Sequence, residues 1–251
     1  MAGGPLFTIV TPVRDAARTL AAAVASAQAQ TLPDWEMLLA DDGSTDGSRA
    51  MAEGFAGRDP RIRALALPAP RGAAAARNLA IRAARGRHIA FLDADDMWRP
   101  GKLAAQAAAF AEGEGLVFTA YQRIDMEGRR LSRVDVPARL TYAEALMGNA
   151  ICCSTAAYDA GRLGLVEMPD LPRRQDYGLW LTLLRRLPAA RGLGEVLLDY
   201  RVTPGSLSGN KLAAAAATWR VYREVAGLSR APAAWALANN LARGAWKRRR
   251  G

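Results

Sequence analysis

The 251-residue sequence predicts an α/β fold built on a doubly wound, mostly parallel sheet flanked by helices. Three observations support this expectation. Short apolar runs typical of buried strands alternate with longer helical patterns over the first part of the chain. No stretch approaches the ~20 uninterrupted apolar residues of a membrane span. The two cysteines are adjacent and match neither a disulfide framework nor a metal site, so we expect buried reduced thiols.

The first part of the chain contains four expected strands separated by helices. The strands are Leu6–Thr11, Trp35–Ala40, Ile62–Leu67 and His88–Leu92, and the helices are Thr19–Gln28, a segment from the loop Asp41–Gly47 to about Ala56, and Ala73–Ala84. The third helix stops at Gly86, a frequent C-terminal signal. Because the strands are nearly continuous apolar runs, we expect them to be buried on both faces, as in a parallel sheet.

The second part is less regular. The expected elements are a helix from Pro100 to about Glu112, a strand Leu116–Tyr121, a helix Asp176–Leu187, a strand Glu195–Val202, a turn at Pro204-Gly205 and two helices, Lys211–Ala226 and Pro232–Arg250. Residues 123–172 give no clear periodicity. The helix before residue 187 carries apolar side chains at three-and-four spacing, which is typical of one buried face.

A dense acidic cluster follows the fourth expected strand. The segment His88–Trp98 is HIAFLDADDMW, an apolar run that ends in Asp93, Asp95 and Asp96. Ligands of open α/β sheets bind outside the carboxyl ends of the strands, and clustered carboxylates repel one another unless a cation or a proton lies among them. Mg²⁺ and Mn²⁺ prefer oxygen ligands. The cluster therefore indicates a metal-bridged phosphate site, with a solvated acidic turn as the alternative.

A second polar segment, Asp41–Asp46, follows the second strand directly. A carboxylate there can contact the edge of a nucleobase or a ribose hydroxyl, while a hydroxyl of the same loop can cap the next helix. A dinucleotide site is disfavoured, because Thr11–Arg14 stands where a glycine fingerprint would be needed. A diphosphate would therefore need other counter-charge, for which a metal on Asp95 and the side chain of Arg77 are candidates.

Five segments resemble, in order, family 2 glycosyltransferases with the GT-A fold. They are FTIVTPVRDAARTL, QTLPDWEMLLADDGSTDGS, RGAAAARNLAIRAARGRHIAFLDADDMWRPGKL, RRQDYGLWLTLLRR and YRVTPGSLS. The pairing of DDGSTD with DADD roughly fifty residues later is far more specific than a lone D-x-D. The resemblance spans about residues 6–209. It implies a GT-A domain at 1–209, with a nucleotide-binding half at about 6–96 and an acceptor half at 97–208, followed by a helical tail at 210–251.

The resemblance implies inverting transfer of a sugar from a nucleotide-sugar, usually a UDP-sugar, to a hydroxyl acceptor with Mn²⁺ or Mg²⁺. Carried over by position, Pro12 and Val13 line the nucleotide, Asp42 contacts the uracil, Arg77 lies near the base or the diphosphate, Asp93 holds the ribose, Ala94 allows close approach, Asp95 coordinates the metal and Asp176 is the catalytic base. Inversion needs a carboxylate to accept the acceptor's proton, which agrees with the last role. An N-cap at the start of a helix is the alternative for Asp176.

Several positions depart from the family pattern. Gln175 stands where Glu commonly precedes the base, and Thr203 stands where a His can reach the metal. Arg14-Asp15 replace a common Tyr-Asn pair near the nucleobase, which makes UDP less secure. The lone histidine, His88, is expected at the surface, and its solitude argues against a Ser–His mechanism.

The C-terminal tail is strongly basic. Residues 210–251 hold nine Lys or Arg and one acidic residue, a net charge of +8, whereas the whole chain carries +10. One helical face of residues 232–250 is expected to be apolar, with Ala234, Trp235, Leu237, Ala238, Leu241, Ala242, Ala245 and Trp246. Such a helix suits an anionic membrane interface, and packing on the domain is an equal alternative. No nucleic acid is expected, since no stacking aromatics accompany the charge.

Together these features predict a cytoplasmic glycosyltransferase of polysaccharide or cell-envelope biosynthesis, with peripheral attachment to the inner membrane face as a further hypothesis. Its expected partners are a nucleotide-sugar donor and a glycan or lipid-linked acceptor. Two alternatives stay open. A catalytically silent nucleotide-sugar binding module would lack the base, whereas a nucleotidyltransferase on a related fold would carry a glycine-rich basic loop after the first strand.

Overall fold

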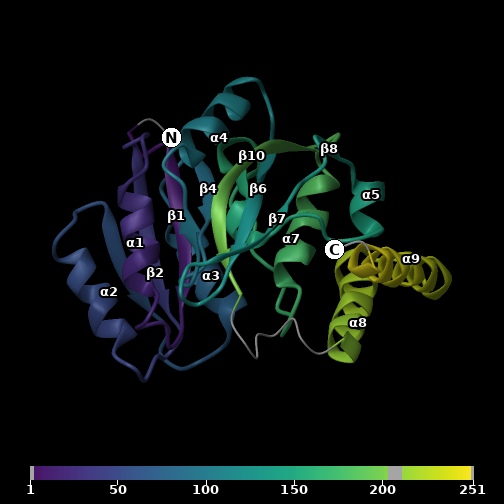
Figure 1. Ribbon diagram of the computed structural model, residues 1–251, viewed down its shortest axis with the longest axis horizontal. Coiled ribbons are helices and arrows are strands. Elements are labelled where there is room, and N and C mark those ends of the chain that lie inside the picture. Colours follow the sequence, from purple (N-terminus) through teal and green to yellow (C-terminus); the bar gives the residue numbers. More distant parts are fainter. Residues whose placement is uncertain (1–2, 203–210, 250–251) are drawn as a thin grey trace.

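The computed structural model describes residues 3–202 and 211–249, except for the side chains of residues 211–212 and 243–249 (Figure 1). Its strands are β1 (Phe7–Val13), β2 (Trp35–Asp41), β3 (Ile62–Ala66), β4 (His88–Phe91), β5 (Met97–Trp98), β6 (Leu116–Ile124), β7 (Arg130–Val134), β8 (Arg139–Leu140), β9 (Ala157–Asp159) and β10 (Ala190–Arg201). Its helices are α1 (Leu20–Gln28), α2 (Ser48–Ala56), α3 (Ala73–Ala83), α4 (Lys102–Ala111), α5 (Tyr142–Leu146), α6 (Ala160–Leu163), α7 (Gln175–Leu184), α8 (Lys211–Arg220) and α9 (Arg230–Arg249), with a 3₁₀ turn η1 (Cys153–Thr155) and a π-helical turn η2 (Val221–Val225).

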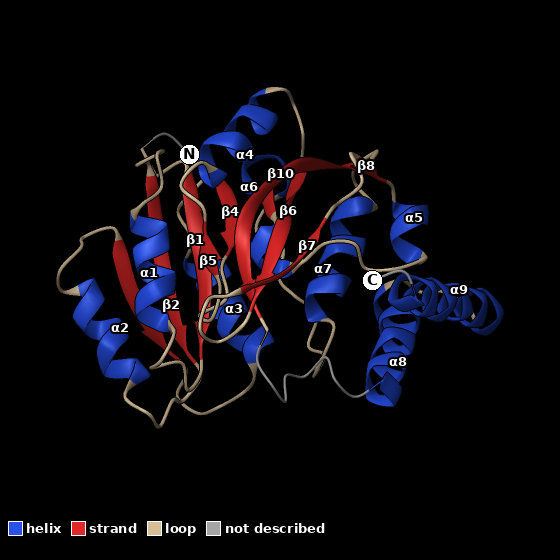
Figure 2. Ribbon diagram, viewed as in Figure 1, coloured by secondary structure: helices blue, strands red, loops and turns tan. Residues whose placement is uncertain are grey.

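One sheet runs through the described part of the molecule, in the order β3-β2-β1-β4-β9-β6-β10-β5. β3, β2, β1 and β4 are parallel, and β6 is parallel to β10. Between these two parallel groups lies β9, which pairs antiparallel with both β4 and β6. Figure 2 shows the helices on both faces of this sheet. The mixed α/β architecture with a mostly parallel sheet confirms the expected fold class.

Two apolar cores cover the two faces of the sheet. One contains side chains of α1, α2 and α4, such as Leu20, Ala52 and Phe110. The other contains side chains of α3 and α7, and also Tyr222 of η2 and Ala233 of α9. Because the C-terminal helices share the second core, they are packed onto α7, at one end of the molecule in Figure 1.

The structure differs from the sequence expectations mainly after residue 120. β10 begins at Ala190, five residues before the expected strand. The sequence does not reveal this start, because the two glycines near it are typical of a loop. A side chain at Gly192 would meet the Pro137 carbonyl oxygen at 1.9 Å, so glycine is needed where the chain passes this close. β7 is almost fully exposed and therefore has no apolar periodicity to detect. The expected turn at Pro204-Gly205 lies outside the described residues.

The expectation that His88 lies at the surface is wrong. The side chain is only 4% exposed. Its ring stacks on Phe110 with centroids 4.1 Å apart and lies 5.1 Å from the ring of Phe7. Burial lowers the pKa of His88 to about 4, so the imidazole is neutral at physiological pH. It serves packing between the sheet and α4.

The last helix, α9, has two different apolar faces. Ala233 and Ala236 are buried against the domain, and Leu237 is half-buried. On another side of the helix, Trp235 is 63% exposed and Leu241 is 50% exposed. The packing alternative is therefore confirmed for one face, while the second face stays uncovered. Within residues 3–202 and 211–249, no helix is long and apolar enough to cross a membrane.

Candidate active site

Three parallel strands bring the predicted nucleotide residues to one edge of the sheet. β1 ends at Val13, β2 is followed by Asp42, and the loop after β4 carries Asp93 and Asp95. A cavity of about 800 Å³, named here the strand-end cavity, opens between them. Its lining includes Pro12, Val13, Asp42, Asp93, Ala94 and Asp95. The structure thus brings these six predicted residues together, as expected when parallel strands end at the same edge.

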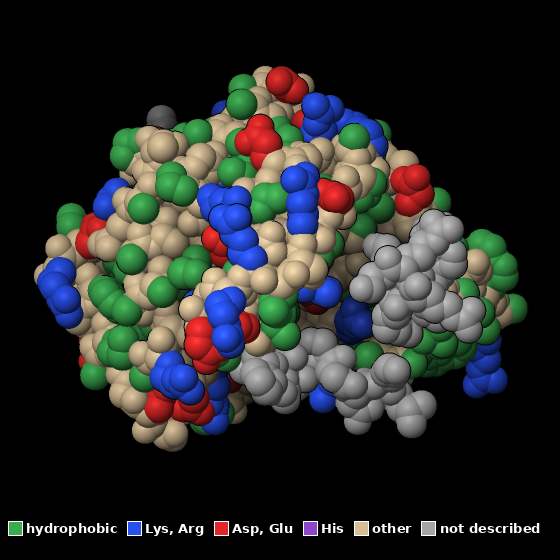
Figure 3. All heavy atoms as spheres, in the orientation of Figure 1, with side chains coloured by type: hydrophobic (Ala, Val, Ile, Leu, Met, Phe, Trp, Pro, Cys, Tyr) green, Lys and Arg blue, Asp and Glu red, His purple; other side chains and the backbone are tan. Residues whose placement is uncertain are grey.

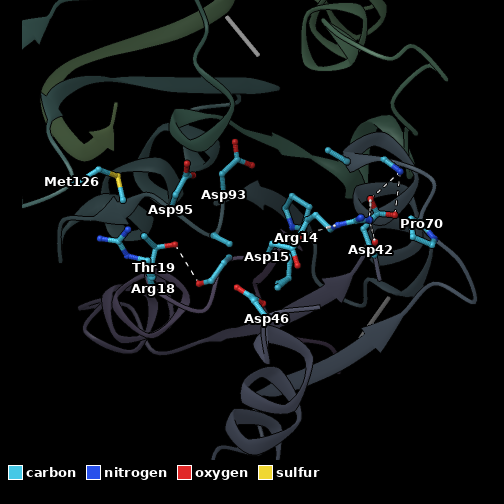
Figure 4. A pocket seen from close by; sticks show the side chains of 16 residues that line it. Arg14, Asp15, Arg18, Thr19, Asp42, Asp46, Pro70, Asp93, Asp95 and Met126 are labelled. Atoms are coloured by element: carbon cyan, nitrogen blue, oxygen red, sulfur yellow. Dashed lines mark hydrogen bonds and ion pairs between the residues drawn. The ribbon is translucent and has the colours of Figure 1, made fainter. Parts of the chain in front are cut away.

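Asp42 lies at one end of this cavity, near Arg14 and Pro70 (Figure 4). Its carboxylate accepts hydrogen bonds from the backbone N–H of Arg71 at 2.6 Å and of Gly72 at 2.9 Å. Arg14 donates to the Asp42 carbonyl oxygen at 2.5 Å, and the same guanidinium lies 3.7 Å from the carboxylate. The Asp42 carboxylate is a fixed acceptor and the Arg14 guanidinium beside it is a donor. Together they can pair with a nucleobase edge that presents a donor and an acceptor side by side.

Asp95, Arg18 and Met126 lie toward the other end of the cavity (Figure 4). Burial, and after it the charge of Asp93, raises the pKa of Asp95 to about 6. The charges of Arg201 and Arg77 and a backbone hydrogen bond oppose this rise only in part. Arg18, which also lines this end, has no ion pair within the described residues. A carboxylate beside a cation without an ion pair suits a metal ion and phosphate oxygens.

Protein ligands alone do not complete a metal site in the described part of the chain, where no three His, Cys, Asp or Glu residues gather to hold an ion. Asp95 and its neighbour Asp93 are the carboxylates of the loop after β4 that line the cavity. Mg²⁺ commonly takes one or two carboxylates and completes its shell with substrate phosphates and water. The donor set fits that kind of shared ion.

Asp176 lies in a second cavity of about 420 Å³, named here the Asp176 cavity. Asp93 lines both this cavity and the strand-end cavity, so the two spaces adjoin at the acidic loop. Asn149 donates a hydrogen bond to the Asp176 carboxylate at 3.4 Å. Since α7 begins at Gln175 and its N-cap residue is Arg174, Asp176 is not the N-cap, but it lies in the first turn, where a negative charge stabilises the helix dipole.

Desolvation raises the pKa of Asp176 above its ordinary value. The positive charges of Arg77 and Arg174 oppose this rise, while the charge of Asp93 adds to it. A raised pKa gives the ionised carboxylate a higher affinity for a proton, which suits a general base.

Arg77 does not line the strand-end cavity. It is only 6% exposed and donates to the Asp93 carboxylate at 2.5 Å, on the side of the Asp176 cavity. Burial by itself would lower the pKa of this guanidinium, but the negative charge of Asp93 raises the pKa above the ordinary value. Arg77 therefore orients the acidic loop, and Arg14 and Arg18 are the arginines that line the strand-end cavity.

Sequence reasoning missed several cavity residues. Arg18 and Met126 line the strand-end cavity, and Asn149 and Arg174 line the Asp176 cavity. Arg174 alone gives a structural signal, a backbone φ of 62° that non-glycine residues seldom adopt. No local sequence pattern marks the others, because their roles come from segments that meet only in the fold. The buried, reduced Cys153 confirms the expectation for the cysteines, and Cys152 is free and half-buried.

Comparison with known proteins agrees with this geometry. Residues 8–159 match the family model described as glycosyl transferase family 2. TuaG of Bacillus subtilis, a glycosyltransferase named for teichuronic acid biosynthesis, is 39% identical over 92% of both chains. WfgD of Escherichia coli, named as a UDP-Glc:alpha-D-GlcNAc-diphosphoundecaprenol beta-1,3-glucosyltransferase, is 33% identical over 86% of this chain and 85% of its own.

Solved structures show the same fold. TarS of S. aureus in complex with UDP has a TM-score of 0.71 at 17% identity, covering 94% of this chain and 70% of its own. The mannosyltransferase PcManGT of Pyrobaculum calidifontis, in complex with GDP-Man and Mn²⁺, has a TM-score of 0.68 at 19% identity, covering 100% of this chain and 77% of its own. The fold is therefore GT-A. With its matched motifs, its cell-envelope relatives and this architecture, the chain belongs to glycosyl transferase family 2 and is a glycosyltransferase.

Proposed function

We propose that the protein transfers a sugar from a UDP-sugar to a hydroxyl group of its acceptor, with inversion at the anomeric carbon. The observation that carries this proposal is the junction of two cavities at Asp93, one suited to a nucleotide diphosphate and the other holding Asp176. The names of WfgD and TarS, which mention UDP-Glc and UDP, support the choice of nucleotide.

In the proposed reaction the donor lies in the strand-end cavity with its base at Asp42 and Arg14. The acceptor hydroxyl attacks the anomeric carbon from the side of the Asp176 cavity, opposite the departing diphosphate. A bond forms between that carbon and the acceptor oxygen, the bond to the diphosphate breaks, and Asp176 takes the hydroxyl proton. Asp93, held by Arg77, contacts the ribose. Ala94 leaves room for close approach of the donor.

Asp95 is the proposed ligand of Mn²⁺ or Mg²⁺. When bound, such an ion neutralises charge that develops on the leaving diphosphate. The Mn²⁺ in the structure of PcManGT supports a metal in this family. Arg18, at the same end of the cavity, contributes a second positive charge to the diphosphate.

The proposed acceptor is a lipid-linked saccharide. WfgD and WfaP of Escherichia coli are both named for transfer to GlcNAc-diphosphoundecaprenol, and WfaP is 34% identical over 82% of this chain. An acceptor anchored in a membrane requires the enzyme to work at its surface. The exposed apolar face of α9 and the +8 charge of residues 210–251 are the proposed attachment to an anionic membrane.

A panel of UDP-, GDP- and TDP-sugars tests this function, with product formation and donor hydrolysis measured on the full chain. We expect turnover with a UDP-sugar and an acceptor carrying a diphosphate-linked lipid. Binding of UDP-sugars without turnover of any kind would instead support the silent binding module. Release of inorganic diphosphate from a nucleoside triphosphate and a sugar phosphate would support a nucleotidyltransferase.

A further inference from the structure

A third cavity adjoins the Asp176 cavity and shares no lining residue with the strand-end cavity. This outer cavity, of about 400 Å³, is lined by Asn149, Ala150 and Arg174, which also line the Asp176 cavity. The shared residues make the two spaces adjoin. Asn240 of α9 lines the far side of the outer cavity. A path of adjoining cavities therefore leads from the catalytic carboxylate to the last helix.

Arg174 is the charged residue of the outer cavity whose side chain has no contact partner, although its charge acts on Asp176 from a distance. Of the other charged residues in its lining, Arg139 forms an ion pair with Glu114, and the Glu144 carboxylate accepts hydrogen bonds from Thr141. Within residues 3–202 and 211–249, the guanidinium of Arg174 forms neither an ion pair nor a hydrogen bond, and only its backbone carbonyl accepts one, from the N–H of Gly178. A half-buried guanidinium without a partner in a cavity favours binding of an anion there.

The backbone at Arg174 is also unusual. Its φ of 62° lies in the left-handed region, which Gly and Asn adopt more readily than a long side chain does. Arginine is thus a poor choice for backbone stability at this position. Strained residues of this kind concentrate at functional sites, which agrees with a role for the guanidinium in binding.

Helix α9 connects this cavity with an exposed apolar surface. Asn240 donates to the Tyr222 hydroxyl at 3.2 Å, and Tyr222 lies 3.1 Å from the hydroxyl of Tyr177 in α7. These contacts fix α9 beside the helix that carries Asp176. The next residue along α9, Leu241, is half exposed, and Trp235 is more exposed still. Figure 3 shows apolar side chains at this end of the molecule.

We propose that the outer cavity binds the diphosphate of a lipid-linked acceptor, with Arg174 as the cation that holds it. The acceptor sugar then lies at Asp176, and the hydrocarbon chain follows the exposed face of α9. This inference rests on the proposed function, since it assigns a site to the acceptor of that reaction. It also explains why an unpaired arginine stands between the catalytic cavity and an apolar helix face.

Calorimetric titration of farnesyl diphosphate into the full chain tests the proposal. The protein is first saturated with UDP and Mn²⁺, so that the strand-end cavity is occupied. We expect binding by the wild type and a loss of about tenfold or more in affinity for Arg174→Asn, since one charge-assisted contact is removed. Asn suits the left-handed backbone, so the variant is expected to keep or raise the Tm. Arg174→Lys, which keeps the charge, should bind more tightly than Arg174→Asn.

Controls separate the contributions of charge and chain. Arg49→Gln, which removes an exposed arginine of α2, should leave the affinity unchanged. Inorganic diphosphate and farnesol should each bind more weakly than farnesyl diphosphate. Equal affinity of Arg174→Asn and the wild type for farnesyl diphosphate would overturn the proposal. So would farnesol, or inorganic diphosphate, binding as tightly as farnesyl diphosphate. UDP binding and UDP-sugar hydrolysis, measured on the same proteins, report on the proposed function alone, because neither requires the acceptor site.

Discussion

Asp176 is the residue on which the proposed chemistry depends most directly. Asp176→Asn keeps the shape of the side chain but cannot take up the acceptor proton, so transfer should fall by ~10²-fold or more while UDP affinity stays the same. Initial rates with a saturating donor measure this effect. Asp170→Asn, which alters an exposed carboxylate in the preceding loop, is the matched control. Wild-type turnover by Asp176→Asn would remove the base from the mechanism.

The electrostatic surroundings of Asp176 predict a pH effect. Desolvation raises the pKa of the carboxyl group, and Arg77 and Arg174 limit that rise. Because the base must be ionised, the rate should decline as the pH falls through this raised pKa. Removing the charge in Arg174→Asn should move the acidic limb of the kcat–pH profile to higher pH. An acidic limb at the same pH in both proteins would show that the charge of Arg174 does not affect the pKa of Asp176.

Asp95 predicts how the metal affects donor binding. Its carboxylate lies beside Asp93, and burial is the chief cause that raises its pKa to about 6, so a cation bound there is expected to relieve the repulsion between the two carboxylates. Calorimetry should give a higher UDP affinity with Mn²⁺ than with a chelator, and Asp95→Ala should abolish this difference. Should the chelator leave wild-type affinity unchanged, the ion has no part in nucleotide binding.

At the scale of a single element, α9 makes the clearest prediction. Truncation before this helix would uncover the core, because Ala233 and Ala236 are buried in it. Substitution of the exposed face avoids that problem. Trp235→Ser with Leu241→Ser should reduce flotation of the full chain with anionic vesicles, above all at high salt, where the basic residues are screened.

Leu131 supplies the control for the α9 experiment. It is 56% exposed on β7, so Leu131→Ser removes exposed apolar area comparable to that of Leu241 from a different surface. Flotation of this variant should equal that of the wild type. If the double variant of α9 floats as well as the wild type in high salt, membrane attachment lies elsewhere.

At the scale of the whole molecule, His88 predicts sensitivity to acid. Its folded-state pKa of about 4 lies below the ordinary value of 6.5, so the unfolded chain takes up a proton first as the pH falls. The free energy of unfolding should therefore be unaffected by this group above about pH 6.5 and decrease toward pH 4, by at most about 1.4 kcal/mol per pH unit. His88→Phe keeps the aromatic stack without a titrating group. Urea unfolding across this range should give a shallower pH dependence for the variant; parallel curves would exclude His88 as the cause.

The sequence alone determined the strands β1, β2 and β4 and the polar segments that follow them. Each strand is an apolar run buried on both faces, so its composition reports its environment. Since parallel strands end at one edge, the order of the motifs was enough to predict that Asp42, Asp93 and Asp95 meet. The role of Asp176 came from the family resemblance, because nothing in its local pattern distinguishes a base from a helix cap.

Only the tertiary structure decided how the second half completes the site. β9 inserts antiparallel between β4 and β6, and the adjacent η1 brings the Ser154 hydroxyl to the backbone N–H of Asp93 at 3.1 Å. Arg77 donates to Asp93 and does not line the strand-end cavity, His88 is buried, and α9 has one covered and one exposed apolar face. Local periodicity reports how apolar a segment is. Which distant segment covers it depends on the surfaces that the rest of the fold leaves open.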